Sequence, residues 1–216
     1  MSGSAAALRP RALDLPPAFS VVTLREHGDA FAHACRIAPE VGAGAFVHVG
    51  RFDLVEFAVV LEPEEPLRLA RRGFFAGMVA LAQAIGAFGP AEKAVEFEWP
   101  DAVRFDGARV GGGRLGWPVD CPDDATPEWL VFGASLAAAR IGGAEPGLSP
   151  MLTTLEDEGF EDGRVVAESF GRHLMLAFDA WSERGFAPIE AAYLRRLPRK
   201  AGAQHRLDHN GALLTA

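Results

Sequence analysis

The chain has 216 residues, of which 49% are hydrophobic and 23% are charged, and its net charge at pH 7 is −8. This length and composition predict one soluble globular domain with enough chain for a hydrophobic core, and they exclude a disordered protein. The negative charge argues against a general nucleic-acid or anionic-membrane surface. The apolar runs are too short or too rich in glycine to span a bilayer, so we expect neither nucleic acid nor membrane among the partners.

The ends of the chain and its cysteines indicate where the domain lies and where it is found. The opening stretch is rich in Ala and Pro and has no apolar block followed by a cleavage site. We predict a flexible leader over residues 1–19, one domain over 20–200 and a C-terminal tail over 201–216. Cys35 and Cys121 fit neither a metal-binding spacing nor a disulfide framework, which favours a reducing, cytoplasmic location.

Hydrophobic periodicity and turn residues divide the domain into alternating strands and helices. The predicted strands cover 20–23, 45–49, 55–61, 94–98, 102–105, 108–115 and 129–136. The predicted helices cover 29–37 (ended near Pro39), 67–85, 164–183 (ended by Gly185) and 188–198. Helices grouped around antiparallel hairpins indicate an α+β fold and not a doubly wound sheet.

The most informative segment is a hairpin with three glycines on its return strand. Asp106-Gly107 between two β-prone runs is a strong signal for a two-residue hairpin turn. Glycine weakens a strand, so Gly111–Gly113 inside one suggest that a ligand or another backbone comes very close. Arg109 and Arg114 flank the glycines, and a cationic strand with a bare backbone suits an anionic ligand. The alternative is that Arg109 pairs with Asp101 or Asp106 and the glycines only permit tight packing.

This segment resembles the central motif of the biotin and lipoate protein ligase family. The family motif reads Lys-Trp-Pro-Asn-Asp, a hairpin turn, and then Lys-Leu-Ala-Gly-Ile; here Trp99-Pro100-Asp101 precedes the turn and Arg109-Val110-Gly111-Gly112-Gly113 follows it. Weaker similarity covers most of the chain, including 129–136 and 153–197, and 208–214 resembles the opening strand of the family's small C-terminal domain. The resemblance implies a class II aminoacyl-tRNA synthetase/biotin synthetase-like fold, with a mixed, mostly antiparallel sheet and packed helices.

The resemblance also implies a reaction. In the family, ATP and a carboxylic acid such as biotin or lipoate form an acyl-adenylate, and a lysine of a carrier protein then takes the acyl group. The transition state gathers negative charge, which preorganised donors and a cation stabilise. The resemblance assigns the cation to Arg109, with backbone N–H groups of Gly111, Gly112 and Gly113 as donors, and it allows Mg²⁺ between the phosphates at Asp101.

Further cofactor-binding residues are carried over from the same motifs. Trp99 and Pro100 are expected as a wall of the pocket, although a core tryptophan before a strand-ending proline is an equally ordinary interpretation. Gly42 and Gly44, with Arg51 downstream, stand where the family has an arginine-rich glycine loop, but a Gly-x-Gly is more often a turn. No metal-ligand set is predicted, because His205, Asp208 and His209 have no fourth ligand at a recognisable spacing.

The chain departs from the family motif at four positions. Glu98 and Arg109 stand where the family has lysine, Asp101 stands where it has asparagine, and Ala102 stands where it has aspartate. Arginine keeps its charge but does not copy the reach and point charge of an ammonium. The alternative function is therefore a ligand-binding protein on the same fold that has lost the chemistry.

Overall fold

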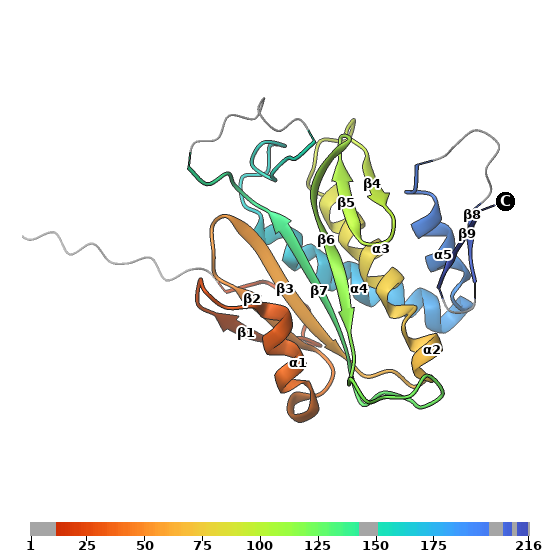
Figure 1. The fold of residues 1–216 in the computed structure, drawn as a ribbon. Helices are drawn as coiled ribbons and strands as arrows, with labels where there is room; N and C mark the ends of the chain where they lie inside the picture. Colours follow the sequence, from red (N-terminus) through yellow and green to blue (C-terminus); the bar gives the residue numbers. More distant parts are fainter. Residues whose placement is uncertain (1–11, 143–150, 199–204, 209–210, 216) are drawn as a thin grey trace, which may run out of the picture.

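A seven-stranded sheet forms the centre of the molecule (Figure 1). The computed structural model describes residues 12–142, 151–198, 205–208 and 211–215. The strands are β1 (Ser20–Leu24), β2 (Ala45–Val49), β3 (Leu54–Leu61), β4 (Val95–Glu98), β5 (Ala102–Phe105), β6 (Ala108–Gly116) and β7 (Leu130–Ala137). Their order across the sheet is β1-β2-β3-β7-β6-β5-β4, and only β1 and β2 pair in parallel. The predicted mixed, mostly antiparallel sheet is confirmed.

Helices cover both faces of this sheet. They are α1 (Ala30–Val41), α2 (Leu67–Ala70), α3 (Gly73–Gly86), α4 (Arg164–Arg184) and α5 (Ala187–Leu194). Helix α1 packs on β2, β3 and β7 from one side, while α3 and α4 pack together on the other side (Figure 1). A small separate hairpin, β8 (His205–Leu207) and β9 (Leu213–Thr215), lies beside α5.

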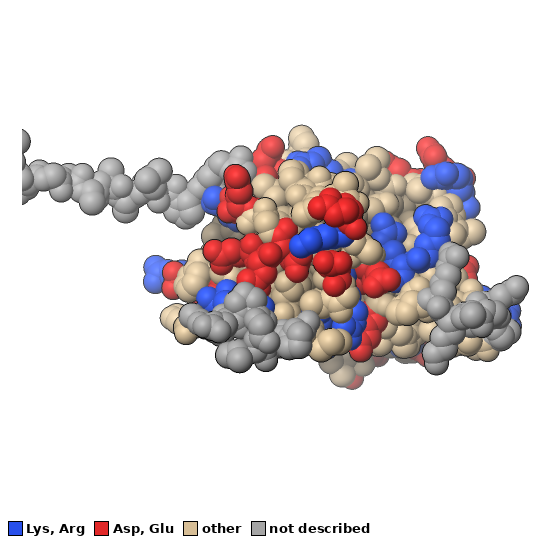
Figure 2. Space-filling view, turned by 90° about the horizontal axis from the view of Figure 1, so that it is seen from above, with Lys and Arg blue, Asp and Glu red and all other residues tan. Residues whose placement is uncertain are grey.

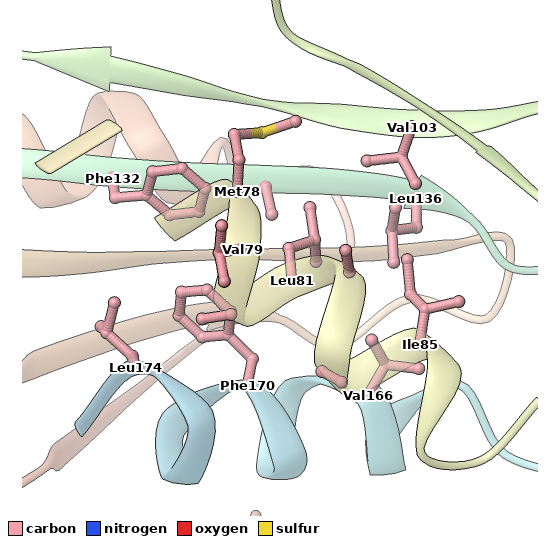
Figure 3. Close-up of a cluster of buried hydrophobic side chains, with 14 of the residues drawn as sticks. Met78, Val79, Leu81, Ile85, Val103, Phe132, Leu136, Val166, Phe170 and Leu174 are labelled. Atoms are coloured by element: carbon pink, nitrogen blue, oxygen red, sulfur yellow. The ribbon is translucent and has the colours of Figure 1, made fainter. Parts of the chain in front are cut away.

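The main core lies between the sheet and the pair α3 and α4. Figure 3 shows Phe170 of α4 and Val79 of α3 beneath Phe132 of β7, with Met78 of α3 beside it. The rings of Phe170 and Phe132 stack with centroids 5.5 Å apart, and Phe57 of β3 lies 4.7 Å from Phe170. Burying one such ring stabilises the fold by about 1.5–3 kcal/mol, so this aromatic cluster fixes the helices against the strands.

The predicted hairpin turn is confirmed. Asp106 and Gly107 join β5 to β6 with φ of 50° and 82°. Positive φ at both central residues is the geometry of the turn type that Asp-Gly favours, because its twist matches that of the flanking strands. The guanidinium of Arg104 donates to the Gly107 carbonyl at 2.7 Å and holds the turn against β5.

Two helix boundaries differ from the sequence prediction. Helix α1 does not end near Pro39 but continues to Val41, with Pro39 in its last turn, and Gly42 (φ 70°) then ends it. The predicted helix over 67–85 is two helices, α2 and α3, with a break at Arg71 and Arg72.

The break has a tertiary cause. The first N–H groups of α2 donate to the loop before β7, from Leu67 to the Ala125 carbonyl at 2.8 Å and from Arg68 to the Asp123 carbonyl at 3.0 Å. These hydrogen bonds hold the first turn of α2 against the loop, separately from α3. The hydrophobic periodicity along 67–85 carries no information about this contact.

The segments next to the domain contribute to it. Of the predicted leader, residues 1–11 lie outside the described residues, while Leu13 is buried in the core and the Asp14 N–H donates to Glu168 Oε1 of α4 at 2.9 Å. In the predicted tail, the Leu207 N–H of β8 donates to Glu190 Oε1 of α5 at 2.8 Å. His209 lies outside the described residues.

The surface reflects the negative charge of the chain. Figure 2 shows Asp and Glu side chains gathered near the middle of the face seen from above, with Lys and Arg among them. Ion pairs also form between charged residues of the described chain, as in Lys93–Glu158 (2.5 Å) and Arg140–Asp157 (2.8 Å). Within the part of the chain that the structure describes, no helix has the length and apolar character needed to cross a membrane.

Candidate functional site

A cavity of about 630 Å³ opens on the face of the sheet that carries α1; we call it the glycine cavity. Its floor comes from β6 and β7, where Gly112 lies opposite Ser135 and Arg114 lies opposite Gly133. Its rim carries Arg51, Arg109 and Arg114, together with the carboxylates Asp29, Glu56 and Asp101. The return strand of the Asp-Gly hairpin therefore faces an open space, with charged groups of both signs around it.

Neighbouring protein groups explain the three glycines of β6. A Cβ on Gly111 would collide with the Ser135 carbonyl oxygen, and a Cβ on Gly112 would collide with the Asp101 carbonyl oxygen. A Cβ on Gly113 would lie 2.7 Å from the sulfur of Met78. Backbone carbonyls thus leave no room for a Cβ at Gly111 and Gly112, while a Cβ at Gly113 would press on core side chains on the other face of the sheet. The strand backbone itself forms the cavity floor.

The backbone of this floor has limited capacity to bind an anion. Strand β6 pairs with β5 on one side and β7 on the other, so the sheet ladder uses its backbone groups. The Gly113 N–H, for example, donates to the Asp101 carbonyl at 2.9 Å. The Gly113 N–H is thus already bonded within the protein, the glycines leave room for a ligand, and the charged side chains of the rim are further groups that could bind an anion.

Arg109 is the cation of this cavity that remains available. Arg51 is held by Asp53 through two hydrogen bonds of 2.9 and 2.6 Å, and Arg114 pairs with Asp29 at 3.0 Å while lying 4.0 Å above the ring of Phe31. The side chain of Arg109 is exposed and makes no ion pair with any residue in the described ranges, so the alternative, a pairing with Asp101 or Asp106, is not found. Its backbone is fixed, since its N–H donates to the Met151 carbonyl at 2.8 Å.

Two of the three carboxylates serve the start of α1. Asp29 is its N-cap and accepts from the Ala32 N–H at 2.8 Å, and Glu56 accepts from the Ala30 N–H at 2.7 Å. These hydrogen bonds satisfy N–H groups that have no partner within the helix. Asp101 is exposed, lines the cavity and accepts no hydrogen bond from the N–H groups of α1. Three carboxylates balance three guanidinium groups, so the rim is close to neutral overall.

A second cavity of about 980 Å³ adjoins the first, and Arg51 and Glu56 line both. Its walls include the apolar residues Leu13, Val55, Leu155 and Phe160, and His48 and Thr23 supply polar groups. Its lining also contains charged residues, namely Glu26, Glu156, Glu161, Asp162 and Arg164. His48 Nε2 and Thr23 Oγ1 lie 2.9 Å apart, and burial lowers the pKa of His48 below its ordinary value, which favours the neutral ring. We call it the apolar cavity. The two cavities together offer a polar compartment and an apolar compartment that meet at one guanidinium.

The structure brings together some of the predicted site residues and separates others. Lining the glycine cavity are Arg51, Asp101, Arg109, Gly111, Gly112 and Gly113. Trp99 is 37% exposed, stacks on Phe75 at 6.2 Å and lines neither cavity. The Pro100 carbonyl accepts from the Tyr193 hydroxyl at 2.6 Å, outside both cavities.

Gly42 and Gly44 also lie elsewhere. Gly42 ends α1, with its N–H bonded to the Ala38 carbonyl. Gly44 joins β1 to β3, since its N–H donates to the Val60 carbonyl and its carbonyl accepts from the Ser20 N–H, both at 2.9 Å. The structure thus gives these two glycines the turn role and places them away from the glycine cavity.

Two of the four departures from the family motif lie in a defined local environment. Glu98 accepts from Arg104 at 3.1 and 2.8 Å, and Ala102 is buried. Cys121 lies in the loop before β7, where its thiol is directed at the carbonyls of Pro122 and Ala125, and it lines neither cavity.

Sequence reasoning missed several residues around the glycine cavity. Asp53 was missed although it is two residues from Arg51, because only the turn between β2 and β3 brings the two side chains together. Ser135 and Gly133 were missed as lining residues, although a glycine inside the apolar run 129–136 is a signal of close approach. Asp29, just before an apolar periodic segment, could have been recognised as an N-cap.

The profile of the Biotin/lipoate A/B protein ligase family matches residues 15–195, and the chain belongs to this family. The chain has the class II synthetase-like architecture that the hairpin motif predicted.

Individual relatives agree with this assignment. A biotin–[acetyl-CoA-carboxylase] ligase from Paracoccus denitrificans is 33% identical over 147 residues, which cover 65% of this chain and 59% of that protein. The chain thus aligns with about three fifths of the length of that curated relative. A crystal structure of a biotin protein ligase-like protein of unknown function from Silicibacter sp. TM1040 is 28% identical, with a TM-score of 0.82 over 95% of this chain and 93% of that one.

More distant structures share the fold. The apo biotin protein ligase from Aquifex aeolicus has a TM-score of 0.69 at 14% identity, over 90% of each chain. A biotin protein ligase from Leishmania major, in complex with biotinyl-5-AMP, has a TM-score of 0.61 at 16% identity, over 93% of this chain and 95% of that chain.

Proposed function

We propose that this protein forms an acyl-adenylate from ATP and a carboxylic acid of the biotin or lipoate type and passes the acyl group to a lysine of a carrier protein. The observation that carries the proposal is that the glycine cavity and the apolar cavity meet at Arg51. An acyl-adenylate has one polar, phosphate-containing part and one largely apolar part, joined at a charged centre. A pair of cavities with a guanidinium at their junction matches that division.

The geometry suggests a role for each charged group. Arg109, whose side chain makes no ion pair within the described ranges, would stabilise charge that develops on the α-phosphate. Arg51, oriented by Asp53, would lie against the junction of acyl group and phosphate. A bare floor at Gly111–Gly113 lets a bulky phosphate approach the sheet closely.

Mg²⁺ fits this cavity only in part. The described residues contain no cluster of three His, Cys, Asp or Glu side chains that would hold a metal ion. Asp101 nevertheless faces the cavity, and Mg²⁺ is commonly bound by one or two carboxylates together with phosphate oxygens and water. Asp101 and the phosphate oxygens of the nucleotide would therefore hold the ion between them. The ion would offset the negative charge of the phosphates, which the near-neutral rim does not offset.

Named relatives support the choice of substrate and partner. The Paracoccus relative is a ligase for acetyl-CoA carboxylase, and solved structures of the same fold contain biotin with ATP, or biotinyl-5-AMP. Biotin is thus the first acid to test, lipoate the second, and a biotinyl or lipoyl carrier domain is the expected acceptor. Because the reaction uses ATP and a carrier enzyme, we place it in the cytoplasm.

An ATP–pyrophosphate exchange assay with biotin, lipoate and octanoate tests the proposal. We expect exchange with at least one acid, and we expect Arg109→Gln to lower its rate. If none of the three acids supported measurable exchange at saturating protein, the proposed reaction would be rejected. Calorimetry with ATP and a stable biotinyl- or lipoyl-adenylate mimic then completes the test, because tight binding without exchange would identify a protein that kept the cavity and lost the chemistry.

A further inference from the structure

A third cavity, of about 660 Å³, lies at the opposite end of β3 and β7 from the glycine cavity. It is bounded by the end of β3, the connection to α2 and the C-terminal half of α4 (Figure 1). The lining of this third cavity has no residue in common with the glycine cavity or the apolar cavity. Its lining is therefore separate from the residues to which the proposed reaction is assigned.

Small residues create the space, and aromatic residues wall it. Where the elements approach one another, the lining includes Ala43, Gly44, Ala70 and Gly73. Their short side chains leave the gap between α4 and the β3–α2 connection unfilled. A volume of this size is within the range of about 300–1,000 Å³ that is typical of small-molecule sites.

The wall contributed by α4 is apolar and partly exposed. Phe178 and Trp181 stack with ring centroids 6.1 Å apart, and Met175, beside them on the lining, is 38% exposed. Both rings are half-buried and line the cavity, so part of each ring is accessible from it. Aromatic faces attract organic cations as well as apolar groups.

The charge at the rim has a single sign. Glu62, Glu64 and Glu65 line the cavity, whereas no Lys, Arg or His among the described residues does. These three glutamates are exposed and form no ion pair with residues of the described ranges. The rim would repel the carboxylic acids and nucleotides that the glycine cavity is proposed to bind, and it would attract a cation.

We propose that the third cavity binds a small organic cation with an apolar body, of the class of arylalkylamines. Its apolar part occupies the space against Phe178 and Trp181, and its ammonium group lies among the carboxylates of 62–65. The two features are complementary: the aromatic wall without the carboxylates would select any apolar molecule, and the carboxylates without the wall would hold only hydrated ions.

Calorimetry on the full chain tests this with 4-phenylbutylamine and its neutral counterpart 4-phenylbutanol. We expect saturable binding of one amine per chain, about tenfold tighter than the alcohol at low salt, and weakened by salt. The triple variant Glu62→Gln, Glu64→Gln, Glu65→Gln should bind the amine no better than the alcohol. Ser182→Trp, on the exposed side of the lining, should fill the cavity and abolish binding of both.

A matched control separates the local effect from net charge. The control is a second triple variant, Glu40→Gln, Asp124→Asn, Glu128→Gln. It removes the same number of negative charges at exposed positions that line none of the cavities, and it should keep the wild-type affinity for the amine. Thermal melting confirms that each variant is folded. No saturable binding of the amine, equal affinity for amine and alcohol, or equal loss in both triple variants would overturn the proposal.

Discussion

Arg51 and Asp53 are joined by two hydrogen bonds, Nε to Oδ1 at 2.9 Å and Nη2 to Oδ2 at 2.6 Å, at the turn between β2 and β3. The same turn is tied to the end of β7, because the Asp53 carbonyl accepts from the Ala138 N–H at 2.8 Å. The pair therefore fixes the guanidinium that lies between the glycine cavity and the apolar cavity. A two-point bond to a planar guanidinium fixes direction as well as distance.

This pair makes stability depend on pH in a defined window. The hydrogen bond from Arg51 lowers the pKa of Asp53 below its ordinary value of 3.8, so the folded state binds this proton less readily than the unfolded state. The stabilisation is then present above about pH 4 and is lost as the pH falls through the lower, folded-state pKa.

Urea unfolding should show Asp53→Asn less stable than wild type at pH 7 and pH 5, with the difference shrinking toward pH 3. Asp124→Asn, at an exposed position, is the control, and a constant difference for Asp53→Asn at every pH would contradict the assignment.

Arg109 should matter for binding and not for folding. Its side chain is exposed and has no ion-pair partner in the described part of the chain, so Arg109→Gln is expected to change the free energy of unfolding by less than about 0.5 kcal/mol. The same change should weaken binding of an adenylate mimic about tenfold or more, because a charge-assisted contact is removed. Calorimetry and urea unfolding on one preparation measure both quantities.

Arg109→Lys introduces the lysine of the family motif and is compared with wild type and with Arg109→Gln. We expect it to raise the rate of ATP–pyrophosphate exchange above wild type, since a compact ammonium reaches phosphate and carboxylate oxygens that a planar guanidinium approaches differently. An unchanged or lower rate would show that arginine is not what limits the chemistry.

The glycines of β6 should resist substitution for a different reason from the glycine of the turn. Gly111→Ala and Gly112→Ala each place a Cβ against a neighbouring carbonyl oxygen, which we expect to destabilise the fold by about 2–4 kcal/mol. Gly107→Ala meets nothing within 4 Å and carries only the cost of its φ of 82°, about 1 kcal/mol. Denaturant unfolding of the three variants compares these costs, and equal losses would show that packing in the sheet is not the cause.

Phe170 should be among the most sensitive positions of the core. It is fully buried between Phe132 and Phe57, so Phe170→Ala removes a ring from a closely packed cluster and should cost about 3–5 kcal/mol. Leu176 on the same helix is 62% exposed, and Leu176→Ala should change stability by less than about 0.5 kcal/mol. Thermal or urea unfolding tests both, and similar losses would mean that α4 does not pack as described.

Much of the fold follows from local patterns. The Asp106-Gly107 turn and the extent of α4 match their predictions because a turn dipeptide and a 3.6-residue periodicity act within a few residues. The break between α2 and α3 does not follow from such a pattern, since it depends on the loop before β7, more than fifty residues away. Pro39 was expected to end α1 but sits in its last turn, where the helix loses only one hydrogen bond.

The sequence by itself determined the class of fold, the hairpin and its glycines, and the family to which those residues point. Only the tertiary structure decided which residues share a cavity. Strand β7 lies between β3 and β6 in the sheet, although β3 is far from both in the chain, so this order brings Arg51 and Arg109 to one cavity and leaves Gly42, Gly44 and Trp99 outside it. Pairing on both sides of β6 likewise sets the surroundings of its glycines, because the carbonyl oxygens of Ser135 and Asp101 lie against Gly111 and Gly112 and leave no room for a side chain there.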